Sequence, residues 1–253
     1  RLVTPAMLND SVALQAWLDQ RVVSPFFNGG AWVAGADGVV LADVPRSAGR
    51  VGVSYKDREH VAAVLRDGKP VISRPVLGKK RNLPLISMVV PVLDAQGRVI
   101  GVLTGVTDLD KPNFLDKIAQ SRYGQAGGYL LMAPQHGVFV TATDKTRTMQ
   151  PLPAPGSNAM YDRYMQGFEG YGVAVSSRGV EELSAAKGIP TAGWLLAVLP
   201  VPPRQMMKWS IRHNLKRLIL NMDACVSLFG VPSVILRKTS LKIWRNVVEE
   251  LDA

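Results

Sequence analysis

Six polar residues in the first half of the chain stand at the ends of predicted helices and strands, or interrupt a predicted apolar strand. They are Tyr55, Asp57, Arg58, Ser73, Arg74 and Asp108. An arginine guanidinium can hold a carboxylate through two parallel hydrogen bonds, and an aspartate can hold an ammonium group. If the fold brings these side chains to one face of a sheet, they predict a binding site for a small organic acid or amino acid. In the alternative interpretation, Asp57 caps a helix and Arg74 is a solvated strand residue.

Four charged residues in the second half flank a segment with proline at positions 151, 153 and 155; they are Asp144, Arg147, Asp162 and Arg163. Proline at every other position makes this segment stiff and extended. We expect the four side chains to form a buried arginine–carboxylate network that pins the segment, rather than a ligand site.

Motifs of common enzyme classes are absent from the sequence. It has no glycine-rich phosphate loop ending in Lys-Ser/Thr, no Gly-x-Ser-x-Gly elbow and no His-Glu-x-x-His pair. His60, His136 and His213 are far apart in the chain, so we predict solvated or structural roles for them and no metal site. The one cysteine, Cys225, has no base beside it and is expected to pack as a small apolar residue. The sequence therefore predicts a chain without catalysis and without a cofactor.

The elements that would position these residues follow from hydrophobic periodicity. Residues 5–23 predict a helix with Leu14, Trp17 and Leu18 on one apolar stripe. Residues 28–109 then read as strand, strand, helix, strand, strand, strand, and a short helix is expected over 112–122. The predicted strands are 31–34, 39–44, 70–77, 85–93 and 99–107, and the predicted helix between them is 55–67. This order is typical of a five-stranded antiparallel sheet with a helix on one face, an α+β domain of PAS-like type.

The same pattern recurs in the second half of the chain. The run 36–43 resembles 135–144, the run 71–74 resembles 175–178, and the run 101–106 resembles 193–198. The unequal offsets indicate duplication of a structural unit with different loops. We therefore predict two tandem PAS-like modules, each an antiparallel sheet with flanking helices, on a long N-terminal helix. The expected boundaries are 1–27 for the N-terminal helix, 28–122 and 123–201 for the two modules, and 202–253 for a basic tail.

The formal charge of +10 is the one extreme of the composition, and it admits a nucleic-acid-binding protein as an alternative function. Half of the excess lies in residues 201–253, and the rest is interspersed with acidic residues. We interpret the basic run Lys79-Lys80-Arg81 as a solvated hairpin tip. Residues 218–236 are long enough for a membrane span but contain Asp223 and Pro232. The tail is therefore a weak span, a set of amphipathic helices at a membrane surface, or a frameshift or cloning scar.

Short motifs in both modules resemble the double-Cache extracytoplasmic sensor domains of bacterial diguanylate cyclases. They occupy 36–38, 68–75, 94–103, 107–109 and 112–114 in the first module, and 143–145, 155–156, 162–163 and 167–170 in the second. The resemblance implies a homodimer formed through the N-terminal helix, flanking membrane spans, and a periplasm-facing domain at the bacterial inner membrane. It also implies a small ligand in the first, membrane-distal module that controls a cytoplasmic diguanylate cyclase and so cyclic-di-GMP signalling. A chemoreceptor or a histidine kinase is the alternative output.

The resemblance also bears on the ligand. Amino-acid-binding relatives carry an aspartate near the end of the last strand, which Asp108 is expected to match. They also carry an Arg-x-Trp pattern, which this sequence lacks because Glu59 and His60 follow Arg58. The sequence therefore leaves the ligand open between an organic acid and an amino acid.

Overall fold

The computed structural model describes residues 3–20, 26–116, 128–175 and 181–199. These residues form two compact units, unit 1 up to Asn113 and unit 2 from Phe114 onwards. The module boundary expected at 122–123 lies outside the described residues, as does most of the helix expected over 112–122. His213, Cys225 and the whole predicted tail also lie outside them.

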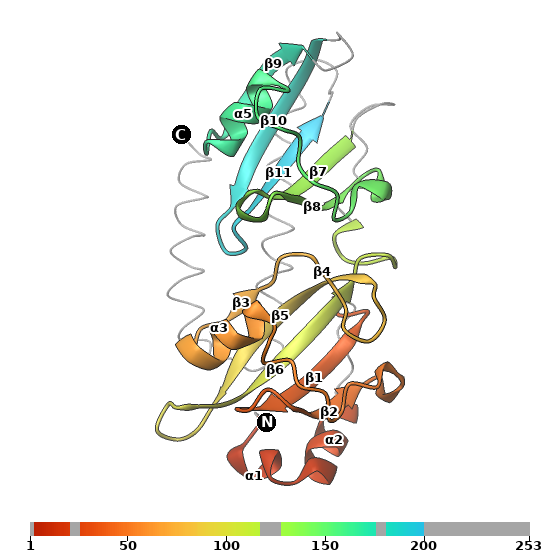
Figure 1. Cartoon of the computed structure of the whole chain (residues 1–253), viewed down its shortest axis with the longest axis vertical. Coiled ribbons are helices and arrows are strands. Elements are labelled where there is room, and N and C mark those ends of the chain that lie inside the picture. Colours follow the sequence, from red (N-terminus) through yellow and green to blue (C-terminus); the bar gives the residue numbers. More distant parts are fainter. Residues whose placement is uncertain (1–2, 21–25, 117–127, 176–180, 200–253) are drawn as a thin grey trace. The chain divides into compact units, whose positions relative to one another are not determined.

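Unit 1 contains one antiparallel sheet with helices packed against it (Figure 1). Its helical segments are α1 (Pro5–Leu8), α2 (Ser11–Asp19), the 3-10 turn η1 (Arg46–Ala48) and α3 (Glu59–Asp67). Its strands are β1 (Gly30–Gly35), β2 (Val40–Val44), β3 (Val71–Ile72), β4 (Val76–Leu77), β5 (Pro84–Leu93) and β6 (Val99–Asp108). The strand order is β2-β1-β6-β5-β3, and β4 pairs with the other end of β5.

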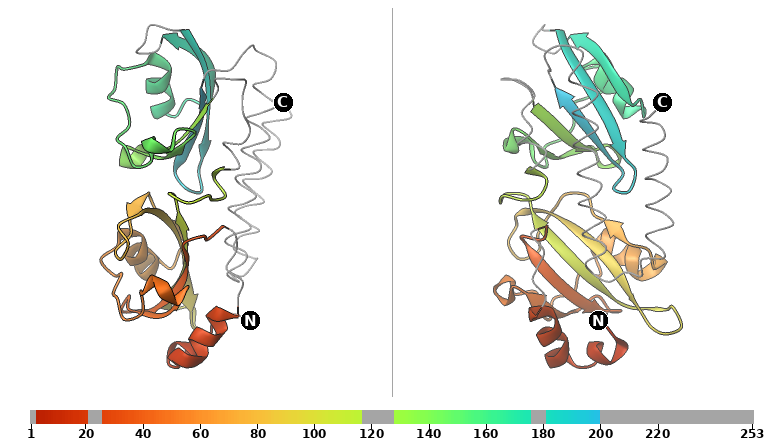
Figure 2. Two further views of the ribbon diagram at one scale, coloured as in Figure 1. Left: turned by 90° about the vertical axis from the view of Figure 1, so that its right-hand side faces the viewer. Right: turned by 180° about the vertical axis from the view of Figure 1, so that it is seen from behind.

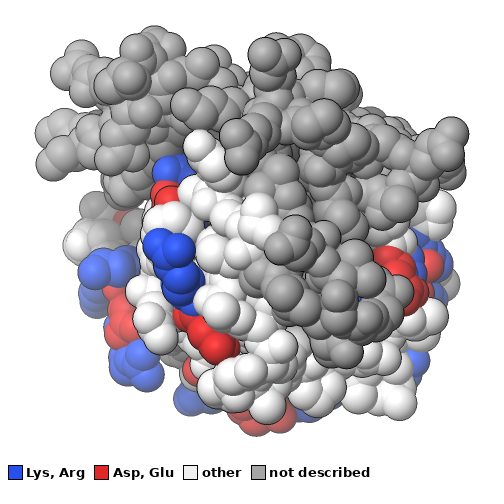
Figure 3. Space-filling model, turned by 90° about the horizontal axis from the view of Figure 1, so that it is seen from above, with Lys and Arg blue, Asp and Glu red and all other residues white. Residues whose placement is uncertain are grey.

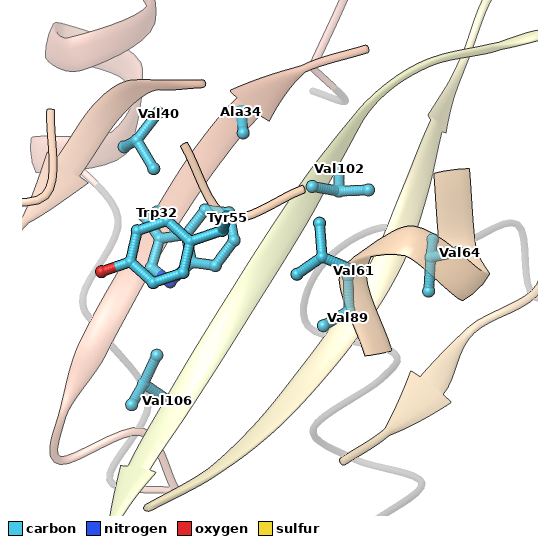
Figure 4. Packing of buried hydrophobic residues seen from close by; sticks show 9 residues of the cluster. All are labelled: Trp32, Ala34, Val40, Tyr55, Val61, Val64, Val89, Val102 and Val106. Carbon is cyan, nitrogen blue, oxygen red and sulfur yellow. The ribbon is translucent and has the colours of Figure 1, made fainter. Parts of the chain in front are cut away.

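The two faces of this sheet pack against different helices, because successive strand residues point to opposite sides. Trp32 of β1 lies in one apolar cluster with Val61 and Val64 of α3 (Figure 4). Its neighbour Val33 lies in a second cluster, with Leu14 of α2. The sheet is therefore covered by α3 and nearby loops on one face, seen edge-on in the left panel of Figure 2, and by α2 on the other.

Tight turns join β1 to β2 and β5 to β6. Gly38, between β1 and β2, has a φ of +78°, and a Cβ there would lie 2.7 Å from the Cβ of Lys56. Only glycine fits that position without strain. In the β5–β6 hairpin, the Asp94 carboxylate accepts hydrogen bonds from the backbone N–H groups of Gln96 and Arg98. The β1–β2 and β5–β6 connections are therefore tight hairpins.

The predicted N-terminal helix is interrupted. The apolar stripe is present, since Leu14 and Leu18 are buried, but the helix expected over 5–23 is two helices, α1 and α2. The Asp10 carboxylate accepts hydrogen bonds from the N–H groups of Val12 and Ala13, and so caps a new helix that begins at Ser11. Up to Gln20, where the described N-terminal residues end, the chain therefore has no single long helix.

The strand predicted over 70–77 is also interrupted, and forms β3 and β4. Ile72 pairs with Met88, whereas Val76 pairs with Leu85, so the register of pairing with β5 shifts by one residue between them. Pro75 lies in this break, and proline has no N–H to donate to the ladder.

Unit 2 repeats the architecture of unit 1. Its strands are β7 (Gly128–Ala133), β8 (Val138–Ala142), β9 (Gly170–Val175), β10 (Glu181–Ile189) and β11 (Trp194–Leu199). Its helical segments are η2 (Pro134–His136), η3 (Lys145–Arg147) and α5 (Ala159–Met165), and Met160 and Tyr164 of α5 pack on the sheet. The strand order is β8-β7-β11-β10-β9. If β3 and β4 are counted as one interrupted strand, the strands of both sheets run 2-1-5-4-3 within their units, which confirms the predicted duplication and the α+β class.

The arginine–carboxylate network expected in unit 2 is wrong. Asp144 is exposed and caps η3 by accepting from the N–H of Thr146, while the Asp162 carboxylate accepts from the N–H of Gly156. The guanidinium carbon of Arg147 lies 5.5 Å from the ring centre of Phe139, and that of the exposed Arg163 lies 4.0 Å from the ring centre of Phe168. The two carboxylates accept hydrogen bonds from backbone N–H groups, and the two guanidinium groups lie over aromatic rings. Each charged group therefore has a partner other than the ion pair that we expected. Of the four side chains, that of Asp162 contacts the end of the proline-rich segment, at Gly156, and Leu152 of that segment donates its backbone N–H to the carbonyl oxygen of Gly137.

Within the described residues, no helix combines the length and the apolar character needed to cross a membrane. The candidate span at 218–236 lies outside those residues.

Candidate ligand-binding site

A cavity of about 250 Å³ lies within unit 1, on the α3 face of the sheet. Strands β1, β5 and β6 form one wall, with Trp32, Leu85 and Val106 among the lining residues. Most of the remaining lining comes from three segments: 45–50 after β2, 55–60 before and at the start of α3, and 76–83, which begins with β4. Residues 28–29 and 111 also line the cavity. The volume is below the roughly 300–1,000 Å³ typical of sites for drug-sized ligands, so the cavity suits a small molecule.

Two aromatic rings form an apolar part of the wall. The rings of Trp32 and Tyr55 stack, with centroids 4.9 Å apart and planes at 29° (Figure 4). The ammonium of Lys79 lies 5.4 Å from the centre of the Tyr55 ring, close enough for a cation–π interaction. Burial raises the pKa of the Tyr55 hydroxyl, which is therefore protonated and able to donate a hydrogen bond at neutral pH.

Arg50 is fixed at the cavity by a buried ion pair. Its Nη1 donates to Oδ1 of Asp43 at 2.8 Å, and its Nη2 donates to the carbonyl oxygen of Gly29 at 2.5 Å. The backbone N–H of Arg50 donates to the other Asp43 oxygen at 3.0 Å. The Asp43 side chain is 0% exposed, and burial raises its pKa while the Arg50 charge and hydrogen bonds oppose that shift. A fully buried carboxylate therefore holds one wall cation in place.

Five further cations line the cavity: Arg58, Lys79, Lys80, Arg81 and Lys111. Lys79 donates to Asp57 at 2.6 Å, and Arg81 donates to the carbonyl oxygen of Ser47. Arg58 has no carboxylate partner among the described residues. Counting Arg50, six lining cations face three carboxylates that pair with them, Asp43, Asp57 and Asp108. The site therefore has an excess of positive charge.

Asp108 is the one carboxylate among the lining residues. Its backbone is held on both sides by Asn28, which accepts from the Asp108 N–H at 2.7 Å and donates to its carbonyl oxygen at 3.0 Å. One carboxylate oxygen accepts from the N–H of Asp110, and the other lies 3.6 Å from the Lys111 ammonium. Its charge is therefore already matched within unit 1.

His60 lies at the start of α3 and lines the cavity, although it is only 8% exposed. Burial, with smaller contributions from the charges of Arg58 and Arg74, lowers its pKa from 6.5 to about 4. The imidazole is therefore neutral at neutral pH, and it adds hydrogen-bonding capacity but no charge.

The structure brings three of the six predicted ligand residues to this cavity: Tyr55, Arg58 and Asp108. Asp57 is not a lining residue, and it pairs with Lys79 instead of capping α3, whose N-cap residue is Arg58. Ser73 and Arg74 are not lining residues.

The side chains of Ser73 and Arg74 have other partners. The Ser73 hydroxyl accepts from the N–H of Ser87 and donates to the carbonyl oxygen of Arg74. Arg74 is exposed, 3.7 Å from Glu59, as the alternative interpretation expects for a solvated residue.

Several lining residues were not among the sequence candidates: Trp32, Arg50, His60, Lys79, Lys80, Arg81 and Lys111. The run at 79–81 is exposed, as expected of a hairpin tip, but it also lines the cavity. The clustering of three basic residues in this run was the sequence signal that could have identified it as part of the site. Arg50 gave none, because its role depends on Asp43 being buried beside it.

The arrangement is suited to binding a small anion with an apolar part. Guanidinium and ammonium groups recognise carboxylates, and the aromatic wall can pack against a short hydrocarbon chain. Among the described residues, no group of three histidine, cysteine, aspartate or glutamate side chains is placed to hold a metal ion.

Outside the cavity, basic and acidic side chains are mixed. On the face shown in Figure 3, Lys and Arg atoms lie next to Asp and Glu atoms. Exposed pairs such as Arg66–Asp67 and Arg46–Asp19 follow this pattern. A nucleic-acid interface requires basic residues gathered on one face, so this face does not favour that alternative function.

No protein-family model matches the sequence, and no curated protein matches it. Solved structures do. The ligand-binding domain of the Pseudomonas aeruginosa amino-acid chemoreceptor PctC, in complex with GABA, has a TM-score of 0.58 at 20% identity, over 79% of this chain and 84% of that one. The sensor domain of the Vibrio cholerae histidine kinase DctB has a TM-score of 0.53 at 13% identity, over 79% and 83%.

An extracellular ligand-binding receptor from Desulfohalobium retbaense has a TM-score of 0.56 at 17% identity. The match covers 75% of this chain but only 32% of the receptor, so the chain spans about a third of that protein. All three are ligand-binding or sensor domains, and none is a catalytic domain. At these identities the similarity concerns the fold: the chain has the fold of Cache-like extracellular sensor domains, as the sequence predicts.

Proposed function

We propose that this chain is the extracytoplasmic sensor module of a membrane-bound signalling protein, and that it binds a small molecule in the cavity of unit 1. The observation that carries the proposal is a small cavity with six lining cations and an aromatic wall, on a sensor-domain fold. Solved proteins of this fold have been captured with GABA and with asparagine. The chain acts by binding and carries no catalytic step.

A route from the cavity to the N-terminal helices supports a signalling role. Arg50 pairs with Asp43, and the Asp43 backbone exchanges two hydrogen bonds with the Gln15 side chain of α2. Gln15 also donates to Asp19, which pairs with Arg46. A ligand that binds Arg50 changes the charge at one end of this chain of contacts. It shifts α2 only if it binds two arrangements of unit 1 with different affinity.

For the whole protein, we infer a homodimer formed through the N-terminal segment, held at the bacterial inner membrane by flanking spans and facing the periplasm. The output we favour is a diguanylate cyclase, and a chemoreceptor or histidine kinase is the alternative. A Gly-Gly-Asp/Glu-Glu-Phe motif in the downstream reading frame would identify the cyclase directly. A methyl-accepting or kinase domain in that reading frame would instead identify the output as a chemoreceptor or a histidine kinase.

Ligand binding is tested by a thermal-shift screen of the full chain against organic acids, amino acids and amines, followed by calorimetry of each hit. We expect a hit whose affinity falls at least tenfold in Arg58→Ala, because this cation lines the cavity without a carboxylate partner among the described residues. Arg66→Ala is the matched control, since Arg66 lies on the same helix, is exposed, and pairs with Asp67. The absence of any hit, or equal losses in both variants, would remove the cavity as the sensing site.

A further inference from the structure

We propose that the cavity selects a small organic acid without an amino group, and that Lys111 sets this selectivity by pairing with Asp108. The inference rests on the proposed function and names the class of ligand for that site. It follows from three features: the charge balance of the wall, the position of its one carboxylate, and the apolar surface beside the cations.

The charge balance favours an anion. Arg58, Lys80 and Arg81 line the cavity with no carboxylate partner among the described residues, and His60 beside them is buried. An acid group that enters gains attraction from these cations without displacing an existing ion pair. A zwitterion brings in a second, positive charge, which the same cations repel.

An ammonium group would need a negatively charged hydrogen-bond acceptor, and Asp108 is the one carboxylate that lines the cavity. Its two oxygens face the N–H of Asp110 at 3.1 Å and the Lys111 ammonium at 3.6 Å. The Asn28 side chain fixes the Asp108 backbone with two hydrogen bonds, so the carboxylate is held where Lys111 meets it. An amino acid placed against Asp108 would therefore bring its ammonium next to that of Lys111.

The apolar wall favours an organic over an inorganic anion. Trp32, Tyr55, Leu85 and Val106 all line the cavity, and the first two form a stacked pair. A phosphate ion would leave this surface without a partner, whereas a chain of two to four carbons packs against it. Three-carbon and four-carbon acids are therefore the probes that fit the small volume best.

The test compares acids with their amino counterparts by calorimetry on the full chain: propionate against L-alanine, and succinate against L-aspartate, with inorganic phosphate as a third probe. We expect at least one acid to bind at least tenfold more tightly than its amino counterpart, and more tightly than phosphate. Lys111→Met leaves Asp108 without its ammonium partner. The ratio of the affinity for the acid to the affinity for its amino counterpart should therefore fall at least tenfold in this variant. Lys111 has a side chain that is 53% exposed, so the variant should fold. Lys69→Met, at an exposed lysine that is not a lining residue, should leave the ratio unchanged.

The outcomes separate the two proposals. If an amino acid binds as tightly as its acid, and Arg58→Ala abolishes this binding, the sensing site stands and the acid selectivity is refuted. An unchanged ratio in Lys111→Met refutes the role of that residue. If phosphate binds as tightly as succinate, the site recognises charge alone and the organic-acid class is refuted. If no probe binds, both the selectivity and the proposed cavity fail.

Discussion

Replacement of Arg50 by alanine tests whether the buried ion pair organises the cavity wall. In the folded chain, the fully buried Asp43 carboxylate receives one hydrogen bond from the Arg50 guanidinium at 2.8 Å and one from the Arg50 backbone N–H at 3.0 Å. Alanine keeps the backbone donor and removes the charged one. Asp43 is then left as a buried carboxylate with one neutral hydrogen bond at its side chain.

The expected cost is large for one substitution. Removing one partner of a buried ion pair typically costs about 3–5 kcal/mol, since it leaves an uncompensated charge. We expect about 3 kcal/mol here, near the lower end, because the backbone donor remains. At 1.4 kcal/mol per tenfold change, the population of opened unit 1 should rise on the order of 100-fold.

Hydrogen exchange measured by mass spectrometry on the full chain can follow this change, because peptides from β1 and β2 report on the opening of unit 1 alone. Arg46→Ala is the matched control. Arg46 also pairs with an aspartate, Asp19, but its side chain is 70% exposed, so we expect a loss below about 1 kcal/mol.

The dependence on pH distinguishes a lost charge from lost packing. Burial raises the pKa of Asp43, and Arg50 opposes that shift, so removing Arg50 raises the pKa further. An acid with a raised pKa in the fold favours folding most below its unfolded value of 3.8, and this contribution is lost as the pH rises through the folded pKa. The cost of Arg50→Ala should therefore shrink as the pH falls from 7 towards 4, and adding Asp43→Asn should recover part of it at pH 7. A cost below about 1 kcal/mol, or one equal at both pH values, would refute the reasoning.

Two further substitutions test buried polar groups of unit 1. Because the pKa of His60 is about 4 in the fold against 6.5 ordinarily, its contribution to stability is present above pH 6.5 and is lost, up to about 3 kcal/mol, as the pH falls to about 4. Thermal unfolding of His60→Gln should therefore show a flatter pH dependence over this window, while His136→Gln, at an exposed site, should behave as the parent chain. Ser73→Ala should cost about 1–3 kcal/mol, because the buried N–H of Ser87 loses its side-chain acceptor. The exposed Ser47→Ala should change stability by less than about 0.5 kcal/mol, and equal effects of the two serine variants would contradict this account.

Much of the fold could be predicted because it depends on local signals. The alternation at Trp32 and Val33 assigns β1 to a sheet covered on both faces, and Gly38 marks a turn that only glycine fits. The two wrong element boundaries arise where a single residue overrides the pattern of its neighbours. Asp10 caps a new helix within a continuous apolar stripe, and Pro75 breaks a strand whose composition is otherwise suitable.

The candidate site was harder to predict because it depends on convergence. The sequence could anticipate Tyr55, Arg58 and Asp108, because they lie just before α3 or at the end of β6. Arg50 and the run at 79–81 come from loops, and sequence spacing does not show where a loop closes. The pairing of Lys111 with Asp108 depends on the last residues of unit 1 turning back to the end of β6, which periodicity does not encode.

The stacked Trp32–Tyr55 pair gives the cavity its own optical reporter. Tyrosine passes excitation energy to a tryptophan in contact with it, and indole emission responds to the polarity and charge of its surroundings. With the ring centroids 4.9 Å apart and both side chains in the wall, an anion that enters changes the field at the Trp32 indole. Occupancy of the cavity can therefore be read from intrinsic emission, without a label. The Trp32→Phe variant gives the emission of the four other tryptophans, and subtracting it from the emission of the parent chain leaves the signal of Trp32.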